Sequence, residues 1–381
     1  MGFFANTSWY LANFRMGLLK AAQARGIRVI AIAPLDDYSS SFEEEGLEFR
    51  AVSLVRRNYN PIRKWETVRD LKRIYRQEKI DLVHFFTLEA ILTGTMAAGR
   101  SGPKVIHSVT GMGFIYAGSS MSRRLLRMGL EPLLAGCLRC GPVLVENPAD
   151  QRTVEKILGE KKRFSIECVP GGGVDIEKFH PSGSEHLDPS SGSVRFLVAG
   201  RLLKDKGAGL FVEAVRRYSG PSAEFYLAGL PDEGNPDSYL LSEVEEWETT
   251  PGFHWLRNVD DMASLLRSVD VLVHPTFYGE GLPRIIMEAQ ACGKPVITTN
   301  IPACAEAVEE GKNGWVIDQK DPDLLAKKMC AAAQSKDLRR EMGSRNRLMA
   351  EEKFSEEVAT AKTLMAYRAH YPDWDPENCR S

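Results

Sequence analysis

Two glutamates in the stretch "GEGLPRIIME" could bind a polar ligand. Glu280 and Glu288 are separated by seven residues, and Gly281 and Leu282 follow the first of them directly. Pro283 suits the first turn of a helix, where its missing N–H costs nothing. This places Glu280 in a loop and Glu288 about 8 Å along the helix, at 1.5 Å per residue. The two carboxylates could hold hydroxyls at the two ends of one ligand, whereas the plainer interpretation is an ordinary helix start with a solvated glutamate.

Two cations follow an expected strand in "FLVAGRLLKDKG". Arg201 comes directly after Gly200, and Lys206 follows one short loop later, just before Gly207. Cations beside a helix start suit a diphosphate, because the helix N-terminus adds N–H donors and positive potential. An isolated Arg and Lys are more often surface charges. Together with the two glutamates, however, they predict a ligand with hydroxyls at its ends and a diphosphate in its middle, which is a nucleotide sugar.

Short β-branched runs alternate with helical patterns along the whole chain. The expected strands of the first half are 2–6, 28–34, 48–55, 81–86, 104–111 and 142–147, and those of the second half are 194–200, 224–229, 252–258, 269–275, 295–300 and 314–318. Regular strand–helix alternation predicts parallel sheets covered by helices on both faces. We therefore expect an α/β protein of two Rossmann-like domains facing across a cleft, with ligands bound at the carboxyl ends of the strands.

The length of 381 residues fits two domains rather than one core. Gly, Pro and Ser accumulate in residues 165–196, before a fresh strand. We place the first domain at 1–168 and the second at 169–354. The last helical pattern, 355–371, follows the complete second domain and is expected to return to the first.

Composition indicates an ordinary globular protein, 43% hydrophobic and 26% charged. No run of about 18 apolar residues could span a bilayer, and the start lacks the basic region and cleavage site of a signal peptide. Gly2 is not followed by the Ser or Thr at position six that myristoylation needs. Seven cysteines with irregular spacing indicate a reducing compartment, so we expect a cytoplasmic protein. Cys137 and Cys140 have metal-ligand spacing without a second pair, which favours buried helix cysteines over a metal site.

The net charge of -2 conceals an asymmetry. Residues 1–165 carry 25 Lys+Arg against 16 Asp+Glu, or +9, and the remainder carries 24 against 35, or -11. The basic residues of the first part cluster in three places: Arg56, Arg57, Arg63 and Lys64; Arg123, Arg124 and Arg127; and 161–163. Basic residues beside apolar ones, such as Met112, Phe114, Ile115 and Tyr116, suit an anionic membrane surface, and a solvated helix face is the alternative. No nucleic-acid-binding motif accompanies the charge, so nucleic acid is not an expected partner.

The joint pattern of "GRLLKDKG" and "EGLPRIIMEAQACGKPVITT" resembles the retaining GT-B glycosyltransferases of family four. The similarity extends to "YLANFRMGLL", "VLVENPADQ", "PGGGVDIEKFHP", "GLPDEGNP" and "WLRNVDDM", and so covers nearly the whole chain. Within that family the chain is most similar to bacterial enzymes that extend polyprenyl-diphosphate-linked saccharides, of the N-acetylgalactosaminyltransferase type acting on undecaprenyl-diphosphate-bacillosamine. The resemblance implies a GT-B fold, a UDP-sugar donor carrying an N-acetylhexosamine, a lipid-diphosphate-linked saccharide acceptor, and a peripheral position on the inner face of the cell membrane.

The resemblance also implies residue roles in the second domain. Arg201 and Lys206, beside Gly200, match the residues that hold the donor diphosphate. Glu288 matches the acid that binds the ribose hydroxyls, and Glu280 matches the acid near the transferred sugar. Arg201, Lys206 and Glu280 are therefore the expected catalytic residues. The backbone amides of Gly281 and Leu282 are expected near the sugar or phosphate, and the backbone around Arg257 and Val259 near the base.

On the acceptor side, the resemblance implies a set of residues in two loops of the first domain: Asn13, Arg15, Thr110, Gly111 and Gly113. The chain departs from many relatives in two places. It has "NTSWY" where they carry a Gly-Gly turn after the first strand, and Thr110 where they carry a histidine. His107 lies three positions earlier and points to the opposite face of its strand, which favours a structural role over a catalytic one.

The chemistry follows mainly from electrostatics. Cleavage of the bond between the anomeric carbon and the β-phosphate leaves negative charge on the diphosphate, and Arg201 and Lys206 can stabilise it in place of a metal ion. No metal or other cofactor is therefore expected, and the leaving phosphate itself serves as base in this family. A nucleotide-sugar epimerase of the same fold and a non-catalytic sugar-binding protein are the alternatives. A dinucleotide-dependent oxidoreductase would need G-x-G-x-x-G, and "GMGFIY" and "GGGVDI" have Tyr116 and Ile176 at its third glycine.

Overall fold

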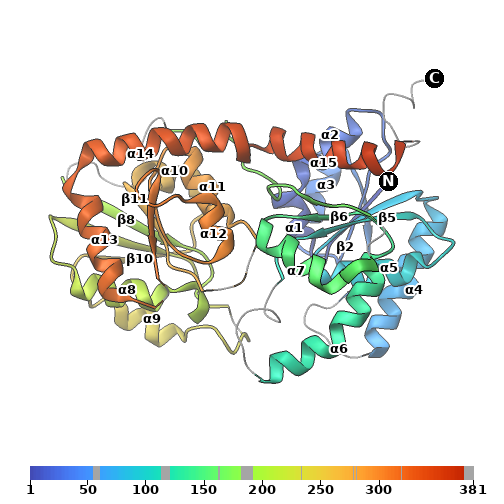
Figure 1. Ribbon diagram of the computed structural model, residues 1–381, viewed down its shortest axis with the longest axis horizontal. Coiled ribbons are helices and arrows are strands. Elements are labelled where there is room, and N and C mark those ends of the chain that lie inside the picture. The colour runs from blue at the N-terminus through green and yellow to red at the C-terminus, as the bar shows by residue number, and fades with distance from the viewer. Residues whose placement is uncertain are drawn as a thin grey trace. The chain divides into compact units, whose positions relative to one another are not determined.

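The computed structural model divides the chain into two compact units (Figure 1). Unit 1 comprises Met1–Gly173 and Glu356–Ser381, and unit 2 comprises Val174–Ser355. The boundary that we expected after residue 168 thus falls after Gly173 in the structure. The structure describes residues 1–54, 61–112, 121–161, 164–181, 192–232, 234–277, 279, 281–318 and 320–372.

Unit 1 is built on a seven-stranded parallel sheet with the order β3-β2-β1-β4-β5-β6-β7. Its strands are β1 (Gly2–Phe4), β2 (Ile30–Ala33), β3 (Glu48–Ala51), β4 (Leu82–Phe86), β5 (Lys104–Val109), β6 (Val143–Val145) and β7 (Ile166–Cys168). The order reverses between β1 and β4, which makes their carboxyl ends the topological switch point of the sheet. β7 was not predicted, because it has only three residues and lies partly exposed at the edge of the sheet.

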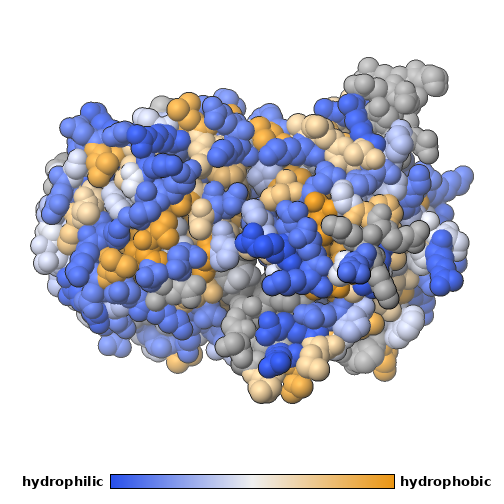
Figure 2. Space-filling model, viewed as in Figure 1, coloured by the Kyte–Doolittle hydropathy of each residue, from blue (hydrophilic) through white to orange (hydrophobic). Residues whose placement is uncertain are grey.

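The helices of unit 1 are α1 (Ser8–Phe14), α2 (Met16–Gln23), α3 (Ser40–Glu44), α4 (Pro61–Gln77), α5 (Leu88–Ala98), α6 (Met121–Leu138), α7 (Pro148–Leu158) and α15 (Glu356–His370), with a short 3-10 turn at Gly159–Lys161. Alternate strand residues pack on opposite faces of the sheet, as the strand period requires. Phe4 and Phe85 enter one apolar core, whereas Phe3 and Phe86 enter the other. Hydrophilic residues dominate the visible surface, but the outer end of α6 shows apolar residues beside them (Figure 2).

Unit 2 is built on a six-stranded parallel sheet with the order β10-β9-β8-β11-β12-β13. Its strands are β8 (Val194–Ala199), β9 (Ala223–Ala228), β10 (Phe253–Arg257), β11 (Val271–His274), β12 (Val296–Thr299) and β13 (Gly314–Ile317). This order has the same reversal as in unit 1, between β8 and β11. All twelve expected strands are present, and the prediction of two Rossmann-like domains is confirmed.

The helices of unit 2 are α8 (Ala208–Arg217), α9 (Leu241–Trp247), α10 (Met262–Ser268), α11 (Arg284–Ala291), α12 (Pro302–Ala307), α13 (Pro322–Gln334) and α14 (Lys336–Met349), with a 3-10 turn at Lys204–Lys206 and a π-helical turn at Ala350–Phe354. We expected Pro283 in the first turn of its helix. Pro283 is instead the N-cap of α11, and its carbonyl accepts a hydrogen bond from the Ile286 amide at 3.1 Å. Its extended ψ of 119° keeps it outside the helix.

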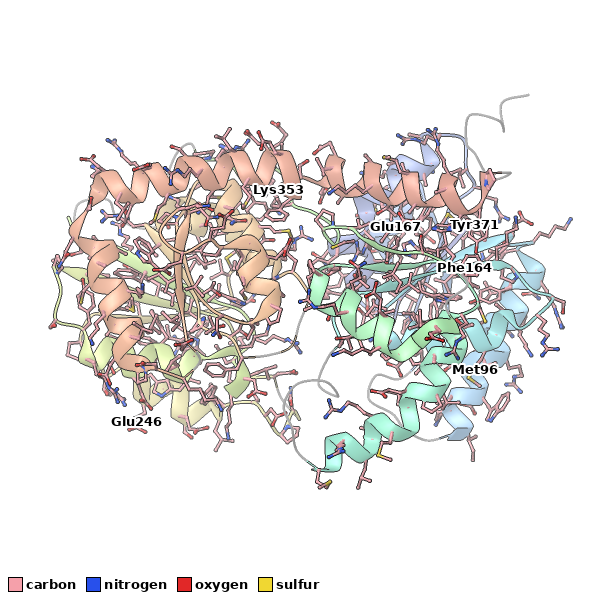
Figure 3. All side chains as sticks on the ribbon, in the orientation of Figure 1. Met96, Phe164, Glu167, Glu246, Lys353 and Tyr371 are labelled. Carbon is pink, nitrogen blue, oxygen red and sulfur yellow. The ribbon has the colours of Figure 1, made fainter. Side chains whose placement is uncertain are left out.

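The C-terminal helix α15 belongs to unit 1, as predicted. Tyr367 of α15 is hydrogen-bonded through its hydroxyl to Nδ1 of the buried His84 at 2.6 Å. The Tyr371 hydroxyl, just past the helix, donates to the carbonyl of Val105 at 2.9 Å. His370 lies 2.8 Å from a carboxylate oxygen of Glu167. Glu167 and Tyr371 are labelled in Figure 3. These contacts attach the end of the chain to β4, β5 and β7.

His107 lies inside the core of unit 1. The residue is fully buried on β5, and its ring centroid lies 5.7 Å from that of Phe85. Neither ring nitrogen makes a hydrogen bond of standard geometry within the described part of the chain. Burial lowers the pKa of His107 to about 3, although the backbone carbonyl of Cys137 opposes part of the shift. A side chain so enclosed has no access to a substrate, in keeping with a structural role.

Replacing this histidine should change how stability depends on pH. The folded protein keeps His107 neutral down to about pH 3, whereas the unfolded chain takes up a proton near pH 6.5. Stability should therefore fall as the pH drops below about 6.5, by up to about 1.4 kcal/mol per pH unit for this group. The His107→Leu variant should lose this component, so that urea unfolding at pH 7.5 and 4.5 shows a drop smaller by about 3 kcal/mol than in wild type.

His254 provides the matched control, because it is exposed on β10. The His254→Leu variant should keep the wild-type difference between the two pH values. Parallel pH profiles for wild type and His107→Leu would show that His107 can be protonated in the folded protein.

Candidate active site

The carboxyl ends of β8 and β11 form the switch point of the sheet in unit 2. The two strands are paired in parallel, with Phe196 opposite Val271 and Leu197 opposite Leu272. The chain leaves β8 through Gly200 and Arg201, and it leaves β11 through the segment 275–283. Ligands of open parallel sheets bind at such a point, where loops diverge from neighbouring strands. The two motifs that we singled out in the sequence therefore start from adjacent strands.

A glycine lets these two loops touch. Gly207 has φ +82°, and a Cβ at this position would lie 2.0 Å from the carbonyl oxygen of Pro275. No other residue can occupy the position without a clash. The neighbouring Asp205 carbonyl accepts hydrogen bonds from the Phe277 amide at 2.7 Å and from the Thr276 hydroxyl at 3.3 Å. These contacts hold the turn that carries Lys206 against the segment after β11.

Arg201 forms an ion pair that the sequence did not reveal. Its Nη1 lies 3.1 Å from Oδ2 of Asp232, in the loop after β9, and the side chain of Arg201 is 50% exposed. Two hydrogen bonds hold Asp232 in place. Its backbone amide donates to the Ser238 hydroxyl at 2.8 Å, and Nδ2 of Asn235 donates to Oδ2 of Asp232 at 3.0 Å. An exposed pair of this kind contributes at most about 1 kcal/mol, so an incoming diphosphate can compete for Arg201. The sequence did contain a signal for Asp232, because "EFYLAGLPDEG" places this acid shortly after a buried strand.

Glu288 is the fifth residue of α11 and is mostly buried. Arg284, one turn earlier, donates from Nε to Oε1 of Glu288 at 2.8 Å. Burial raises the pKa of Glu288, whereas Arg284 and Lys178 act to lower it. A partly desolvated carboxylate gains from further donors, so ligand hydroxyls would be favourable partners for it.

The backbone before α11 is also enclosed. Gly281 and Leu282 are both buried. Glu280, which we predicted as catalytic, lies outside the described residues, as does Gly113 on the acceptor side. The structure therefore brings Arg201, the Lys206 turn and the start of α11 to one edge of unit 2, and it leaves the position of Glu280 open.

The segment predicted to contact the base has an unusual backbone. Arg257, at the end of β10, has φ +55°, and the register of β10 against β9 shifts at this point. Its carbonyl accepts a hydrogen bond from the Gly229 amide at 2.7 Å, and its guanidinium lies 4.5 Å from the ring of Trp255. Val259 packs partly buried against the core. A left-handed backbone conformation is strained for an arginine, and strained residues of this kind are found at binding sites. This strain is in keeping with the predicted contact between the backbone near Arg257 and the base.

Arg15, which we predicted on the acceptor side, forms a buried ion pair. Its Nη2 lies 3.0 Å from Oε1 of Glu146, and its guanidinium donates to the Tyr10 hydroxyl at 2.6 and 3.0 Å. Burial by itself would lower the pKa of Arg15, but Tyr10 and Glu146 reverse this, so the pKa is raised. Its side chain is only 5% exposed. The cluster lies at the carboxyl edge of the sheet in unit 1, where Glu146 follows β6 directly.

Glycines shape this edge as well. A Cβ at Gly172 would lie 2.1 Å from the carbonyl of Phe14, and one at Gly171 would lie 3.0 Å from Glu146 Oε1. The run "PGGGV" thus lets the chain after β7 pass close to Arg15 and its partner. Sequence reasoning missed Glu146 and Tyr10, although "VLVENPADQ" places an acid after a buried strand.

The other acceptor-side predictions lie around this cluster. Asn13 is exposed on α1 and donates to the Trp9 carbonyl at 2.9 Å. Thr110 and Gly111 follow β5, and Gly111 has φ +101°. The Thr110 side chain interacts with the Tyr10 hydroxyl, which links the loop after β5 to the Arg15 cluster.

The two cysteines that we considered as a metal site have different environments in the structure. Cys137 is buried in α6, but Cys140 is exposed beyond the end of the helix, so the expectation of two buried helix cysteines was wrong for Cys140. Within the described ranges no three His, Cys, Asp or Glu side chains are grouped to hold a metal ion.

The two parallel sheets, each with polar groups at its switch point, form the two-domain architecture of solved GT-B glycosyltransferases. The family "Glycosyl transferase 4-like domain" matches residues 11–140, and "Glycosyl transferases group 1" matches residues 184–349. The chain belongs to the glycosyltransferases of family four that combine these two domains, a retaining and metal-independent class. It moves a sugar from a nucleotide sugar, and the predicted enzyme class is confirmed.

Several known proteins resemble the chain over most of its length. It is 24% identical to the N,N'-diacetylbacillosaminyl-diphospho-undecaprenol alpha-1,3-N-acetylgalactosaminyltransferase of Campylobacter jejuni, over 89% of this chain and 90% of that protein. It is 26% identical to an Escherichia coli UDP-Gal:alpha-D-GlcNAc-diphosphoundecaprenol alpha-1,3-galactosyltransferase, over 76% and 75%. The crystal structure of Anabaena HepE in complex with UDP superimposes with a TM-score of 0.77 at 16% identity, over 97% of this chain and 99% of that one.

Removing Arg201 should lower kcat/KM by about a hundredfold or more, since this arginine is expected where charge develops on the leaving group. The same loss is expected for Lys206→Ala. Arg217→Ala is the matched control, because Arg217 is a partly exposed arginine of the same unit that pairs with Asp323 at 2.8 Å. Nucleoside diphosphate release measures all three variants. Activity within twofold of wild type in Arg201→Ala or Lys206→Ala would exclude the diphosphate role.

Proposed function

We propose that the chain transfers an N-acetylhexosamine from a UDP-sugar to a saccharide carried on polyprenyl diphosphate. The observation that carries this proposal is the contact of Gly207 with the Pro275 carbonyl, which holds the Lys206 turn against the segment that leads from β11 to α11. With Arg201 on the same edge, two cations and the N-terminal ends of two helices lie at one switch point. That arrangement suits a diphosphate flanked by hydroxyl-bearing groups.

The proposed reaction needs no external base. The bond between the anomeric carbon and the β-phosphate oxygen breaks, and both of its electrons leave with the diphosphate. The acceptor hydroxyl attacks the anomeric carbon from the same face, and its proton passes to the departing phosphate. Arg201 and Lys206 stabilise the charge that this phosphate gains, and preorganised donors of this kind are worth about 3 kcal/mol each.

The choice of donor and acceptor rests on relatives. The two curated relatives named above act on saccharides linked to undecaprenol through diphosphate, and one of them transfers N-acetylgalactosamine. The Anabaena structure contains UDP. At this level of identity these names support the class of substrate rather than one particular sugar, so we assign the chain a lipid-linked saccharide acceptor and a UDP-sugar donor.

A donor screen tests the reaction. Purified protein is incubated with UDP-N-acetylhexosamines and UDP-hexoses, with and without a polyprenyl-diphosphate saccharide, and UDP release is measured. We expect UDP only when donor and acceptor are both present, with turnover that persists in EDTA. Conversion of the donor without acceptor would indicate the epimerase, and binding without turnover would indicate a sugar-binding protein. Loss of turnover in EDTA with rescue by Mg²⁺ would contradict the role of the two cations.

We also propose that α6 places unit 1 on the membrane that holds the acceptor. Large apolar residues of this helix are exposed, at 49 to 68% of their surface: Met121, Leu125, Leu126, Met128 and Leu133. Arg124 is exposed among them, and the apolar and hydrophilic residues are visible side by side at this end of unit 1 (Figure 2). Helices with this combination lie in the interface of anionic bilayers.

The neighbouring helix α4 has a similar exposed end. Ile62 and Trp65 are exposed by 69% and 63%, and both α4 and α6 pack against α5. Arg63 lies between them in the sequence, and its charge is partly offset by Glu66 at 3.3 Å. Arg56, Arg57 and the residues Phe114, Ile115 and Tyr116, which we also expected near the bilayer, lie outside the described residues. No helix of the described chain is long and apolar enough to cross a membrane.

Vesicle sedimentation tests the membrane proposal. The protein should sediment with phosphatidylglycerol-containing vesicles but not with pure phosphatidylcholine, and salt should release it, because each cation near the surface contributes about 1 kcal/mol. Arg123→Glu with Arg124→Glu should weaken binding, and so should Leu125→Glu with Met128→Glu. Lys336→Glu with Arg340→Glu, on exposed positions of α14, is the control and should not. Equal binding to both vesicle types, or to neither, would leave these side chains as a solvated helix face.

A further inference from the structure

Unit 1 contains a second pocket of basic character, far along the strands from the Arg15 cluster. It has a volume of about 710 Å³ and lies between the end of α4, the turn before β4, the end of α5 and the turn before β5. β4 begins at Leu82 and β5 at Lys104, so the pocket lies at the amino edge of the sheet. The acceptor-side residues follow the carboxyl ends of the same strands. The two sites are therefore on opposite edges of one domain.

The charge of this pocket is strongly one-sided. Five cations line it: Lys72, Arg76, Lys79, Arg100 and Lys104. Asp81 is the only acid among its lining residues, so these residues carry a net charge of +4. Within the described chain none of the five cations forms an ion pair, whereas the neighbouring Arg28 and Arg50 both pair with Glu48 and Glu78. Unneutralised positive charge is thus concentrated in the pocket.

Helix ends account for only part of this charge. Arg76 lies in the last turn of α4, and Arg100 follows the end of α5, so both complement the negative end of a helix dipole. Lys72 lies more than one turn before the end of α4, and Lys104 is the first residue of β5. Dipole complementation gives no reason for either of these to face the same pocket.

A buried hydroxyl is a separate indication of a ligand. Tyr75 lines the pocket and is only 4% exposed, and its hydroxyl has no hydrogen-bond partner within the described chain. A buried phenol without a partner costs free energy. The hydroxyl oxygen is shielded from solvent, so a ligand with acceptor atoms would recover this free energy by opening the pocket wall to it.

The turn after α5 has a backbone that requires glycine, and it fixes where Arg100 and Lys104 leave the chain. Gly99 has φ +60°, and a Cβ at Gly102 would lie 2.2 Å from the Ala98 carbonyl. The turn therefore needs glycine at these positions. It holds Arg100 and Lys104 on the rim, while Lys72 and Arg76 approach from the rigid helix α4. The Lys104 ammonium also lies 5.1 Å from the ring of Tyr371.

We propose that this amino-edge pocket binds a small anion that carries more than one phosphate group. Cations from two sides suit two phosphate groups better than one, and the volume is in the usual range for small-molecule sites. The site is independent of the transfer reaction, because it lies at the opposite edge of the sheet from the acceptor-side residues. Its ligand is therefore not the saccharide that accepts the sugar.

Titration with inorganic pyrophosphate tests the pocket. The donor site would also attract this probe, so the titration uses the Arg201→Ala, Lys206→Ala protein, with circular dichroism to confirm its fold. We expect pyrophosphate to bind this protein in calorimetry, and Arg76→Gln with Lys104→Gln to weaken the binding at least tenfold. Tyr75→Phe should weaken it by about tenfold, the value of one hydrogen bond to a charged group. If the donor-site variant fails to fold, wild type is titrated with and without Arg76→Gln and Lys104→Gln, and the binding component that these two substitutions remove measures the pocket.

The control is Arg124→Gln with Arg127→Gln, which removes two cations of the same unit on α6. This variant should bind pyrophosphate as the parent does. Absence of binding in the parent, or equal weakening in the control, would overturn the proposal and leave the cations as a general surface charge. If Arg76→Gln with Lys104→Gln weakens binding to phosphatidylglycerol vesicles but leaves pyrophosphate binding unchanged, the pocket contacts the lipid surface. That result would also contradict a soluble ligand.

Discussion

The donor side of this protein depends on one steric contact, the approach of Gly207 to the carbonyl of Pro275. A Cβ at 2.0 Å from that oxygen is impossible, so only glycine lets the turn after β8 lie against the segment after β11. The hydrogen bond from the Phe277 amide to the Asp205 carbonyl then fixes the two loops together. This contact keeps the turn that carries Lys206 at the switch point. Unit 1 uses the same device, with Gly172 against the Phe14 carbonyl beside Arg15.

Arg15 and Arg201, at the carboxyl edges of the two sheets, show how the environment of an arginine determines its role. Arg15 is enclosed and must be paired, because an unpaired buried charge would cost several kcal/mol. Glu146 and Tyr10 supply the pairing, and the cluster joins α1, the loop after β6 and the glycine run after β7. Arg201 is half exposed, and its partner Asp232 is held by the loop after β9. A weak, solvated pair can be exchanged for a phosphate, whereas a buried one serves mainly to fix the fold.

The excess of +9 in residues 1–165 separates into different surfaces once the chain is folded. Part of it lies on α6 among exposed leucine and methionine side chains, where cations and apolar groups suit a bilayer. Another part surrounds the pocket at the amino edge of the sheet, away from the residues expected to meet the acceptor. A further part is neutralised in the network of Arg28 and Arg50 with Glu48 and Glu78. The net charge of a segment therefore says little about function until the positions of its charged residues in the fold are known.

The sequence by itself determined the architecture, because strand and helix periods and glycine-rich turns are local signals. It predicted twelve of the strands and the glutamate and cation motifs, and it missed β7, whose three residues carry too little pattern. Only the tertiary structure decided which residues meet. Arg15 pairs with Glu146, and Arg201 with Asp232, which are distant in sequence. Around Tyr75, the cations of its own segment are joined by Arg100 and Lys104 from the next one. Their pairing depends on strand order and loop contacts, which no local pattern encodes. The burial of His107 and the exposure of α6 were decided in the same way, by what packs against each element.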